Sequence, residues 1–213
     1  EVEVALGAAA LIGASALLLA VRAHGHRLAL DQVPLALAQE IHSPALTVFM
    51  RGASRLVEPA VLWPATLAAT LLGVGRRQPG EFPWLAPVAV GGGVTLISIL
   101  KPLLRRARPA AFEHLAPTWG YSLPSGHAFL AATLYGLLAH HGVRWLHARR
   151  PDDRRAAAAL LPVSAAAILL VGVSRVYLGV HYPTDVLAGY ALALLWLWFL
   201  AVINDRPRVP VMT

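Results

Sequence analysis

The sequence predicts an all-α protein built as a bundle of six membrane-spanning helices, and three observations lead to this fold class. Hydrophobic residues make up 57% of the 213 residues and charged residues only 14%, whereas soluble domains contain about 45–50% and about 25%. The mean hydropathy is +0.61. Several apolar runs also reach the roughly 17–25 residues that a helix needs to cross a bilayer. We expect residues 1–213 to form a single membrane domain with a flexible tail at 204–213.

Each predicted span is an apolar run bounded by charged or turn-forming residues. A helix satisfies its own backbone hydrogen bonds, as the interior of a bilayer requires. We therefore expect each run to form one membrane-crossing helix. The predicted spans are Val4–Val21, about Pro59–Gly75, about Trp84–Leu100, about Ser125–Val143, about Ala156–Val173 and about Asp185–Ile203.

The segment 22–58, between the first and second spans, mixes apolar and charged residues. Leu46, Phe49 and Leu56 recur at near-helical spacing. A structureless connection of this length is unusual. We predict one or two short amphipathic helices that lie at the membrane interface, with a solvated loop as the alternative.

The chain is strongly basic, with a net charge of +7 at pH 7. Such a charge suits nucleic acid, anionic lipid or a phosphorylated substrate as a partner. The hydrophobic composition argues against nucleic acid. The sequence contains no cysteine, so disulfides and thiolate metal sites are excluded.

The orientation of the bundle follows from the distribution of its basic residues. Six spans place the second and fourth connections on one side of the membrane, together with both ends of the chain. Lysine and arginine are equally numerous on the two sides, but their densest cluster is Arg144–Arg155 in the fourth connection. The positive-inside rule then makes that side cytoplasmic. The third and fifth connections are expected on the extracytoplasmic face of a bacterial-type cell membrane.

A first motif follows the third span and runs from Lys101 to Arg108-Pro109. Cations just beyond a span commonly anchor it to lipid headgroups. For this motif alone anchoring is the simpler interpretation, and a phosphate site is the alternative. We expect Arg105 and Arg106 to be solvated anchors, with a role in shaping substrate approach as the alternative.

A second motif, Pro124-Ser125-Gly126-His127, opens the fourth span. Ser125 suits an N-cap, and Gly126 leaves room for a ligand to approach the backbone. A helix N-terminus with free N–H groups is a natural phosphate site. The alternative is an ordinary helix start with an incidental histidine.

A third motif joins the end of the fifth span, Ser174-Arg175, to the start of the sixth. Pro183 suits the first turn of the sixth helix. His181 then lies just outside that helix and Asp185 within its first turn, where the carboxylate can accept a hydrogen bond from the imidazole. Such a pair holds a histidine in one tautomer and makes it more basic. A structural hydrogen bond at the membrane boundary is the alternative.

The predicted topology places all three motifs on one face of the membrane. Together they supply two histidines, one carboxylate, three cations and a helix N-terminus. This set suits phosphoryl transfer, in which positioning and charge stabilisation dominate. The residues themselves do not decide which histidine attacks.

The order and spacing of the motifs resemble the three-part signature of the type 2 phosphatidic acid phosphatase superfamily. That signature reads lysine, six residues and Arg-Pro; then Pro-Ser-Gly-His; then Ser-Arg, five residues, histidine, three residues and aspartate. Each piece is short, but the ordered triple is highly specific, and the six spans resemble the lipid phosphatases of the family. The matching residues are Lys101, Arg108, Pro109, Pro124, Ser125, Gly126, His127, Ser174, Arg175, His181 and Asp185.

The resemblance implies a catalytic role for three residues. His181 would attack phosphorus and become phosphohistidine, and Asp185 would orient and polarise it. His127 would protonate the leaving group and then activate water. The residues implied to hold the phosphoryl oxygens are Lys101, Arg108, Ser125, Gly126 and Arg175.

We therefore predict hydrolysis of a lipid phosphate monoester or diphosphate, with phosphatidic acid, phosphatidylglycerophosphate and polyprenyl diphosphates as candidate substrates. No cofactor or metal is expected, because the site residues include no plausible ligand cluster and three are cationic. One alternative is a phosphotransferase that uses the same phosphohistidine. Another is a non-catalytic membrane binding or transport protein, which would need neither nucleophile nor acid. Structural or interfacial roles are expected for His24, His26, His42, His114, His140, His141 and His147.

Overall fold

The computed structural model describes residues 28–74, 84–149 and 154–204, together with five single positions: Leu11, Gly13, Ser15, Val21 and Ala23. These residues form α-helices and one short 3-10 helix, and none of the described residues belongs to a β-strand. This confirms the all-α class. The first predicted span lies almost entirely outside the described residues, and so does the predicted tail beyond Asn204.

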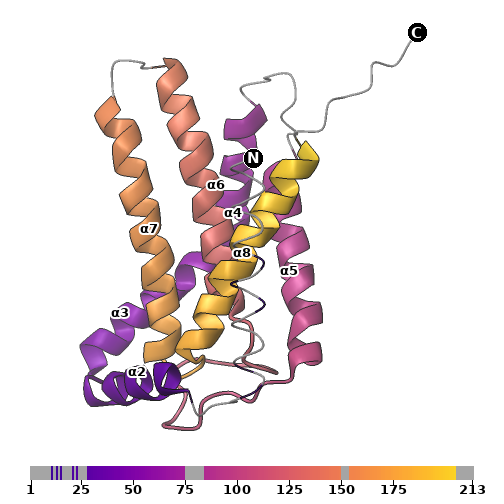
Figure 1. Ribbon diagram of the computed structural model, residues 1–213. Helices are drawn as coiled ribbons and strands as arrows, with labels where there is room; N and C mark the ends of the chain where they lie inside the picture. Colours follow the sequence, from indigo (N-terminus) through magenta and orange to yellow (C-terminus); the bar gives the residue numbers. More distant parts are fainter. Residues whose placement is uncertain are drawn as a thin grey trace.

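Five helices run alongside one another as a bundle (Figure 1). Four of them, α4, α5, α7 and α8, surround α6, which contacts each of the others. Phe129, Leu134 and Val171 are among the largest side chains that are fully buried in this core. The five helices are α4 (Pro59–Val74), α5 (Leu85–Leu104), α6 (Gly126–Arg149), α7 (Arg154–Tyr177) and α8 (Pro183–Asn204).

Three of the described helical segments are long and apolar enough to cross a membrane: Leu85–Leu104, Ala158–Tyr177 and Pro183–Asn204. The apolar part of α4 is shorter and covers Pro59–Leu71. The described structure thus supports three of the six predicted spans on length and hydropathy.

Helix α6 is long but less apolar than its neighbours. It carries His140, His141 and Arg144 within its second half. Of these three residues, His141 is buried, whereas His140 and Arg144 are exposed. These polar residues lower the hydropathy of α6, so α6 is not among the described segments that length and hydropathy support as spans, although about Ser125–Val143 was predicted to be one.

Helices α2 (Ala29–Glu40) and α3 (Pro44–Ser54) and the 3-10 helix η1 (Arg55–Val57) lie across one end of the bundle (Figure 1). The side chain of Ser43 caps α3 by accepting a hydrogen bond from the N–H of Leu46 at 3.3 Å. Of the one or two short helices predicted for the segment 22–58, the structure has two, α2 and α3. Their exposed apolar side chains, which suit an interface with lipid, include Leu30, Val33, Leu37, Val48 and Phe49.

The long connection 105–125 and the short turn 178–182 lie at this same end of the bundle (Figure 1). Two helices run farther than their apolar runs predict. Helix α5 continues to Leu104, so Lys101 occupies its last turn, and α7 continues to Tyr177, so Arg175 occupies its last turn. A run of apolar residues stops at the first charge, whereas helical hydrogen bonding continues past it.

The start of α6 packs closely against α8 because of a glycine. A Cβ atom added at Gly189 would lie 2.6 Å from the carbonyl oxygen of Ser125. In the same region the N–H of Ser125 donates to the carbonyl oxygen of Asp185 at 3.0 Å. The glycine therefore permits direct backbone contact between the second and third motifs.

Candidate active site

The three motifs meet at one end of the bundle. Lys101 comes from the last turn of α5, His127 from the first turn of α6 and Arg175 from the last turn of α7. Arg108 comes from the connection after α5, and His181 from the turn before α8. Lys101, Arg108, Arg175 and His181 are all close enough to His127 to interact with it electrostatically.

His181 and Asp185 form the buried centre of the site. Nδ1 of His181 lies 3.5 Å from Oδ2 of Asp185, and both side chains are almost inaccessible to solvent. This distance is long for a direct N–H···O hydrogen bond. Among the described residues Nδ1 has no other hydrogen-bond partner. The geometry favours a proton on Nδ1 toward the carboxylate, with Nε2 left as the free nitrogen.

The free nitrogen of His181 faces a cation. Nη1 of Arg108 lies 3.5 Å from Nε2 of His181. Burial lowers the pKa of His181 to about 4, and Asp185 opposes this shift. The imidazole is therefore neutral at neutral pH, which leaves a lone pair on Nε2. A neutral histidine beside an arginine is arranged as a nucleophile for an anionic group.

Asp185 is held by donors on both of its oxygens. The backbone N–H of Tyr182 donates to Oδ2 at 2.9 Å. Nη1 of Arg106 donates to Oδ1 at 2.6 Å. A carboxylate that is fixed in this way keeps a constant orientation toward His181.

Arg106 also binds a second buried carboxylate, that of Asp31 on α2. Nη2 of Arg106 donates to Oδ2 of Asp31 at 2.6 Å. Asp31 further accepts hydrogen bonds from the N–H and the hydroxyl of Thr184, each at 2.9 Å. The prediction that Arg106 is a solvated anchor is therefore wrong: it is 9% exposed and lies over the ring of Tyr182. Arg105, in contrast, is exposed.

Asp31 was not predicted as a residue of the site, although the sequence does carry a signal for its burial. Asp31, Leu35 and Ala38 are the buried residues of α2 and share one helical face. A carboxylate at the helical spacing of core residues requires a buried partner. This signal places Asp31 in the interior but does not name Arg106 as the partner.

Lys101 and Arg108 bind the same stretch of backbone. Nζ of Lys101 donates to the carbonyl oxygen of Tyr121 at 2.9 Å. Arg108 donates to the carbonyl oxygens of Trp119 at 2.8 Å and Val180 at 2.7 Å. Arg108 therefore links the connection before α6 to the turn that carries His181, and Lys101 joins the same connection to α5.

The second motif begins α6 as predicted. Ser125 is fully buried, and its Oγ lies 3.5 Å from the N–H of Ala128. Gly126 and His127 are the first residues of the helix. The free N–H groups of this turn point toward the end of the bundle where the cations gather, an arrangement that suits an anion.

Arg175 is buried and connects the site to α3. Its Nη1 donates to the hydroxyl of Ser54, the last residue of α3. Its Nε has no hydrogen-bond partner among the described residues. The sequence gives no signal for Ser54, which lies between two exposed arginines.

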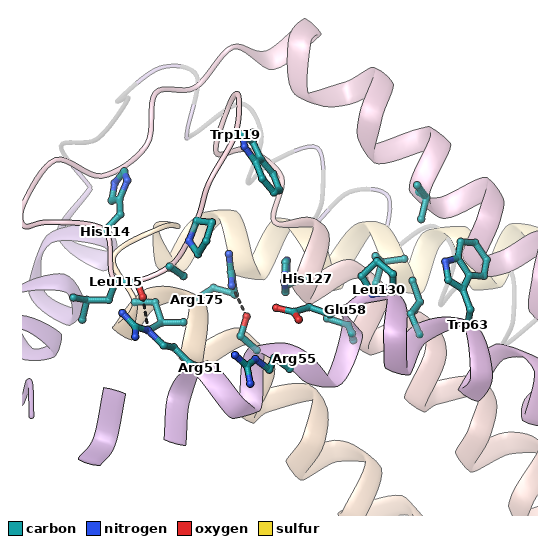
Figure 2. A pocket seen from close by; sticks show the side chains of 18 residues that line it. Arg51, Arg55, Glu58, Trp63, His114, Leu115, Trp119, His127, Leu130 and Arg175 are labelled. Atoms are coloured by element: carbon teal, nitrogen blue, oxygen red, sulfur yellow. Dashed lines mark hydrogen bonds between the residues drawn. The ribbon is translucent and has the colours of Figure 1, made fainter. Parts of the chain in front are cut away.

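A pocket of about 1080 Å³ opens beside His127 and Arg175. In Figure 2 it runs from polar side chains, among them Arg51 and Arg55, to the apolar side chains of Trp63 and Leu130. His181 does not line this pocket. The pocket therefore borders the site at His127 and Arg175, and the buried His181 lies outside its lining.

Four of the remaining described histidines make contacts that suit a structural role. His42 binds the carbonyl oxygen of Tyr177 at 2.9 Å, and His114 binds that of Pro109 at 2.7 Å. His140 and His141 contact each other edge to face. The roles predicted for His24 and His26 concern residues outside the described part of the chain.

Known proteins resemble this chain over most of its length. A family profile described as PAP2 superfamily matches residues 82–208. Phosphatidylglycerophosphatase B of Bacillus subtilis (strain 168) is 32% identical over 169 residues, which cover 78% of this chain and 79% of that protein. Undecaprenyl-diphosphatase of Sulfolobus acidocaldarius is 33% identical over 116 residues, which cover 51% of this chain and 48% of that protein.

A solved structure has the same fold. The crystal structure of a transmembrane PAP2 type phosphatidylglycerolphosphate phosphatase from Bacillus subtilis matches with a TM-score of 0.74 and 27% identity. The match covers 93% of this chain and 96% of that chain. The likeness in structure therefore extends well beyond the residues 82–208 that the family profile matches.

Proposed function

Because the chain belongs to the PAP2 superfamily, we propose that it is a lipid phosphatase of the membrane that works through a phosphohistidine. Two relatives act, by their names, on phosphatidylglycerophosphate and undecaprenyl diphosphate. We assign to this chain the hydrolysis of a lipid phosphate monoester or diphosphate. Phosphatidic acid, phosphatidylglycerophosphate and polyprenyl diphosphates are its candidate substrates.

One observation carries this proposal: the buried His181 and three cations lie within electrostatic range of His127, and His127 lines a pocket with an apolar side. His181 is neutral because burial lowers its pKa to about 4. The pocket combines His127 and Arg175 with the apolar side chains of Leu62 and Leu130. A phosphate group fits the polar part, and a hydrocarbon chain fits the apolar part.

In the first step, Nε2 of His181 attacks phosphorus and a P–N bond forms. The bond between phosphorus and the leaving oxygen breaks, and His127 gives that oxygen a proton. Lys101, Arg108 and Arg175 hold the phosphoryl oxygens as charge develops on them. Asp185 keeps Nδ1–H of His181 in place and stabilises the positive charge on the ring.

In the second step, His127 takes a proton from a water molecule. The water oxygen attacks the phosphorus of the phosphohistidine, the P–N bond breaks, and inorganic phosphate leaves. His181 returns to its neutral form, and His127 regains the proton that it gave to the leaving group. Both steps use residues of the chain and one water molecule.

We also propose that all six predicted spans cross the membrane, with the motif end of the bundle on the extracytoplasmic face of a bacterial-type cell membrane. Helices α4 to α8 lie side by side along one common axis (Figure 1), which supports this topology. Lys101, Arg108 and Arg175 are assigned to phosphate binding, which accounts for their presence on the motif side. Their charges therefore do not require that side to be cytoplasmic under the positive-inside rule. The end of α6 and the start of α7, which carry Arg144 and Arg155, lie at the opposite end of the bundle from the motifs (Figure 1).

We expect the purified protein in detergent to release inorganic phosphate from at least one of the candidate lipids, and to do so in excess chelator. The reason is that histidines and cations perform every proposed step. A parallel reaction with an added acceptor alcohol measures transfer to the acceptor instead of water. Complete loss of activity in chelator, with recovery on adding a divalent metal, would exclude this mechanism.

We expect a cysteine introduced at Thr118 to react with an impermeant thiol reagent on intact cells, and a cysteine at His147 to be protected. Thr118 belongs to the connection at the motif end, and His147 is exposed at the other end of α6. The chain contains no cysteine, so labelling has no background. Labelling after permeabilisation shows that the second site is accessible in principle. The reverse pattern would overturn the orientation and leave the chemistry standing.

A further inference from the structure

The polar wall of the pocket contains two arginines that the proposed mechanism does not use. Arg51 lies in the last turn of α3 and Arg55 follows it in η1. Both side chains line the pocket together with His127 and Arg175 (Figure 2). Both are exposed to solvent, so their charges need no partner for stability.

The backbone places these two arginines on one side of the pocket. They are four residues apart, so they share a helical face. Nε of Arg51 donates to the carbonyl oxygen of Leu115 at 2.7 Å, which orients its guanidinium. Within the described part of the chain neither side chain makes another hydrogen bond or an ion pair. Their remaining donors are available to a ligand.

The wall is joined to the phosphate-binding part of the site. Ser54, between the two arginines in sequence, accepts a hydrogen bond from Nη1 of Arg175. Arg51 and Arg55 therefore lie on the same rigid framework as a residue proposed to hold the reacting phosphate. A ligand group that they bind would lie next to that phosphate.

The pocket lies on the side from which the leaving group departs. In phosphoryl transfer the attacking and leaving atoms lie roughly in line, on opposite sides of phosphorus. His181 attacks from the buried side, and His127, which protonates the leaving oxygen, lines the pocket. The rest of the substrate must therefore pass along the pocket wall that carries Arg51 and Arg55.

The charge on this wall exceeds what one phosphate needs. Lys101, Arg108 and Arg175 already serve the reacting group. Among the described residues that line the pocket, Glu58 is the only acidic one. Even if Glu58 balances one arginine, Arg51 and Arg55 together leave an excess of positive charge. A guanidinium presents paired donors that match a phosphate. Phosphatidic acid has nothing anionic beyond its reacting phosphate, whereas polyprenyl diphosphate and phosphatidylglycerophosphate each carry a second phosphate.

We propose that Arg51 and Arg55 form a subsite for a second phosphate of the substrate, so that the enzyme prefers lipids with two phosphates to lipids with one. This inference rests on the proposed function. The second phosphate is either bonded directly to the first, as in a polyprenyl diphosphate, or separated from it by a glycerol, as in phosphatidylglycerophosphate. Both sources present the same anionic oxygens to the subsite.

The test uses the full-length protein in detergent with four substrates: farnesyl diphosphate, farnesyl monophosphate, phosphatidylglycerophosphate and phosphatidic acid. Arg51→Gln and Arg55→Gln should each lower kcat/KM for a two-phosphate lipid by about tenfold or more, mainly through KM, because each removes charge-assisted hydrogen bonds to the substrate. Activity on the two one-phosphate lipids should change by less than about twofold, since that interaction is absent there. Arg155→Gln, which removes an exposed arginine at the opposite end of the bundle, is the control and should change neither.

The four substrates separate the outcomes. A loss confined to farnesyl diphosphate, or confined to phosphatidylglycerophosphate, supports the subsite and identifies its source of phosphate. An equal loss on all four lipids, or no loss on any, would overturn the subsite, because it would mean that the arginines only contact lipid headgroups in general. A wild-type protein that is inactive on all four would overturn the proposed function itself. Thermal unfolding of each variant shows whether it is folded.

Discussion

Replacing His181 with alanine is expected to abolish both turnover and the covalent intermediate. His181 is the proposed nucleophile, and no other described side chain of the site pairs a neutral imidazole with a buried carboxylate. Loss of a nucleophile in an enzyme with a covalent intermediate lowers kcat by on the order of a millionfold. Rapid quenching without acid should trap phosphohistidine in the wild type and not in His181→Ala.

His127→Ala is the matched comparison, because it removes an imidazole of the same size from the same site. Its turnover on a lipid phosphate should fall by on the order of a hundredfold or more, the usual value for lost acid–base catalysis. A nitrophenyl phosphate ester has a good leaving group that needs no proton, so this substrate should partly rescue His127→Ala and never His181→Ala. If the intermediate persists in His181→Ala and disappears in His127→Ala, the two roles are reversed.

Replacing Arg106 with methionine is expected to destabilise the protein strongly. Arg106 binds the carboxylates of Asp31 and Asp185, each at 2.6 Å, and both are 0% exposed. Without the guanidinium, two buried carboxylates would lose their cation. Removing one member of a buried ion pair costs about 3–5 kcal/mol. The measurement is the midpoint of denaturation of the purified protein in detergent.

Two further variants sharpen this experiment. Arg105→Asn removes the exposed neighbouring arginine, and asparagine suits the left-handed backbone at that position, where φ is 49°. Its stability should be close to that of the wild type. Asp31→Asn keeps the pair between Arg106 and Asp185, so it should destabilise less than Arg106→Met. The double variant Arg106→Met/Asp31→Asn should lose less stability than the losses of the two single variants added together, since the two side chains are in contact. Equal stability of Arg106→Met and Arg105→Asn would contradict the assignment of Arg106 to a buried ion pair.

The helices of the bundle were predictable from sequence because bilayer-sized apolar runs mark them directly. Predicted spans such as about Pro59–Gly75 and about Asp185–Ile203 differ from α4 and α8 by only a few residues. The ends of α5 and α7 were less predictable. Lys101 and Arg175 stop the apolar runs, but their backbones remain helical. The motif residues were recognisable because each lies within a short stretch of sequence.

The contacts that hold the site residues in place could not be predicted in the same way, because they join distant parts of the chain. Asp31 and Arg106 are 75 residues apart in sequence, and Ser54 and Arg175 are 121 apart. Helical spacing shows that Asp31 is buried, but pairing it with an arginine requires knowledge of how α2 lies across the bundle. The same holds for Arg51, whose place in the pocket depends on the position of α3 beside α7.

The apolar side of the pocket affects how the enzyme meets its substrate. Leu62 and Trp63 of α4, Val94 of α5 and Leu130 of α6 line this side, and it leads away from the polar wall (Figure 2). A lipid bound along it keeps its hydrocarbon chain among helices while its phosphate reaches His127. We expect such a lipid to arrive by lateral diffusion within the bilayer rather than from water. The quantity that sets its reaction rate is then the mole fraction of lipid in the membrane, and diluting a mixed micelle with inert detergent would lower the rate even when the bulk concentration of substrate stays the same.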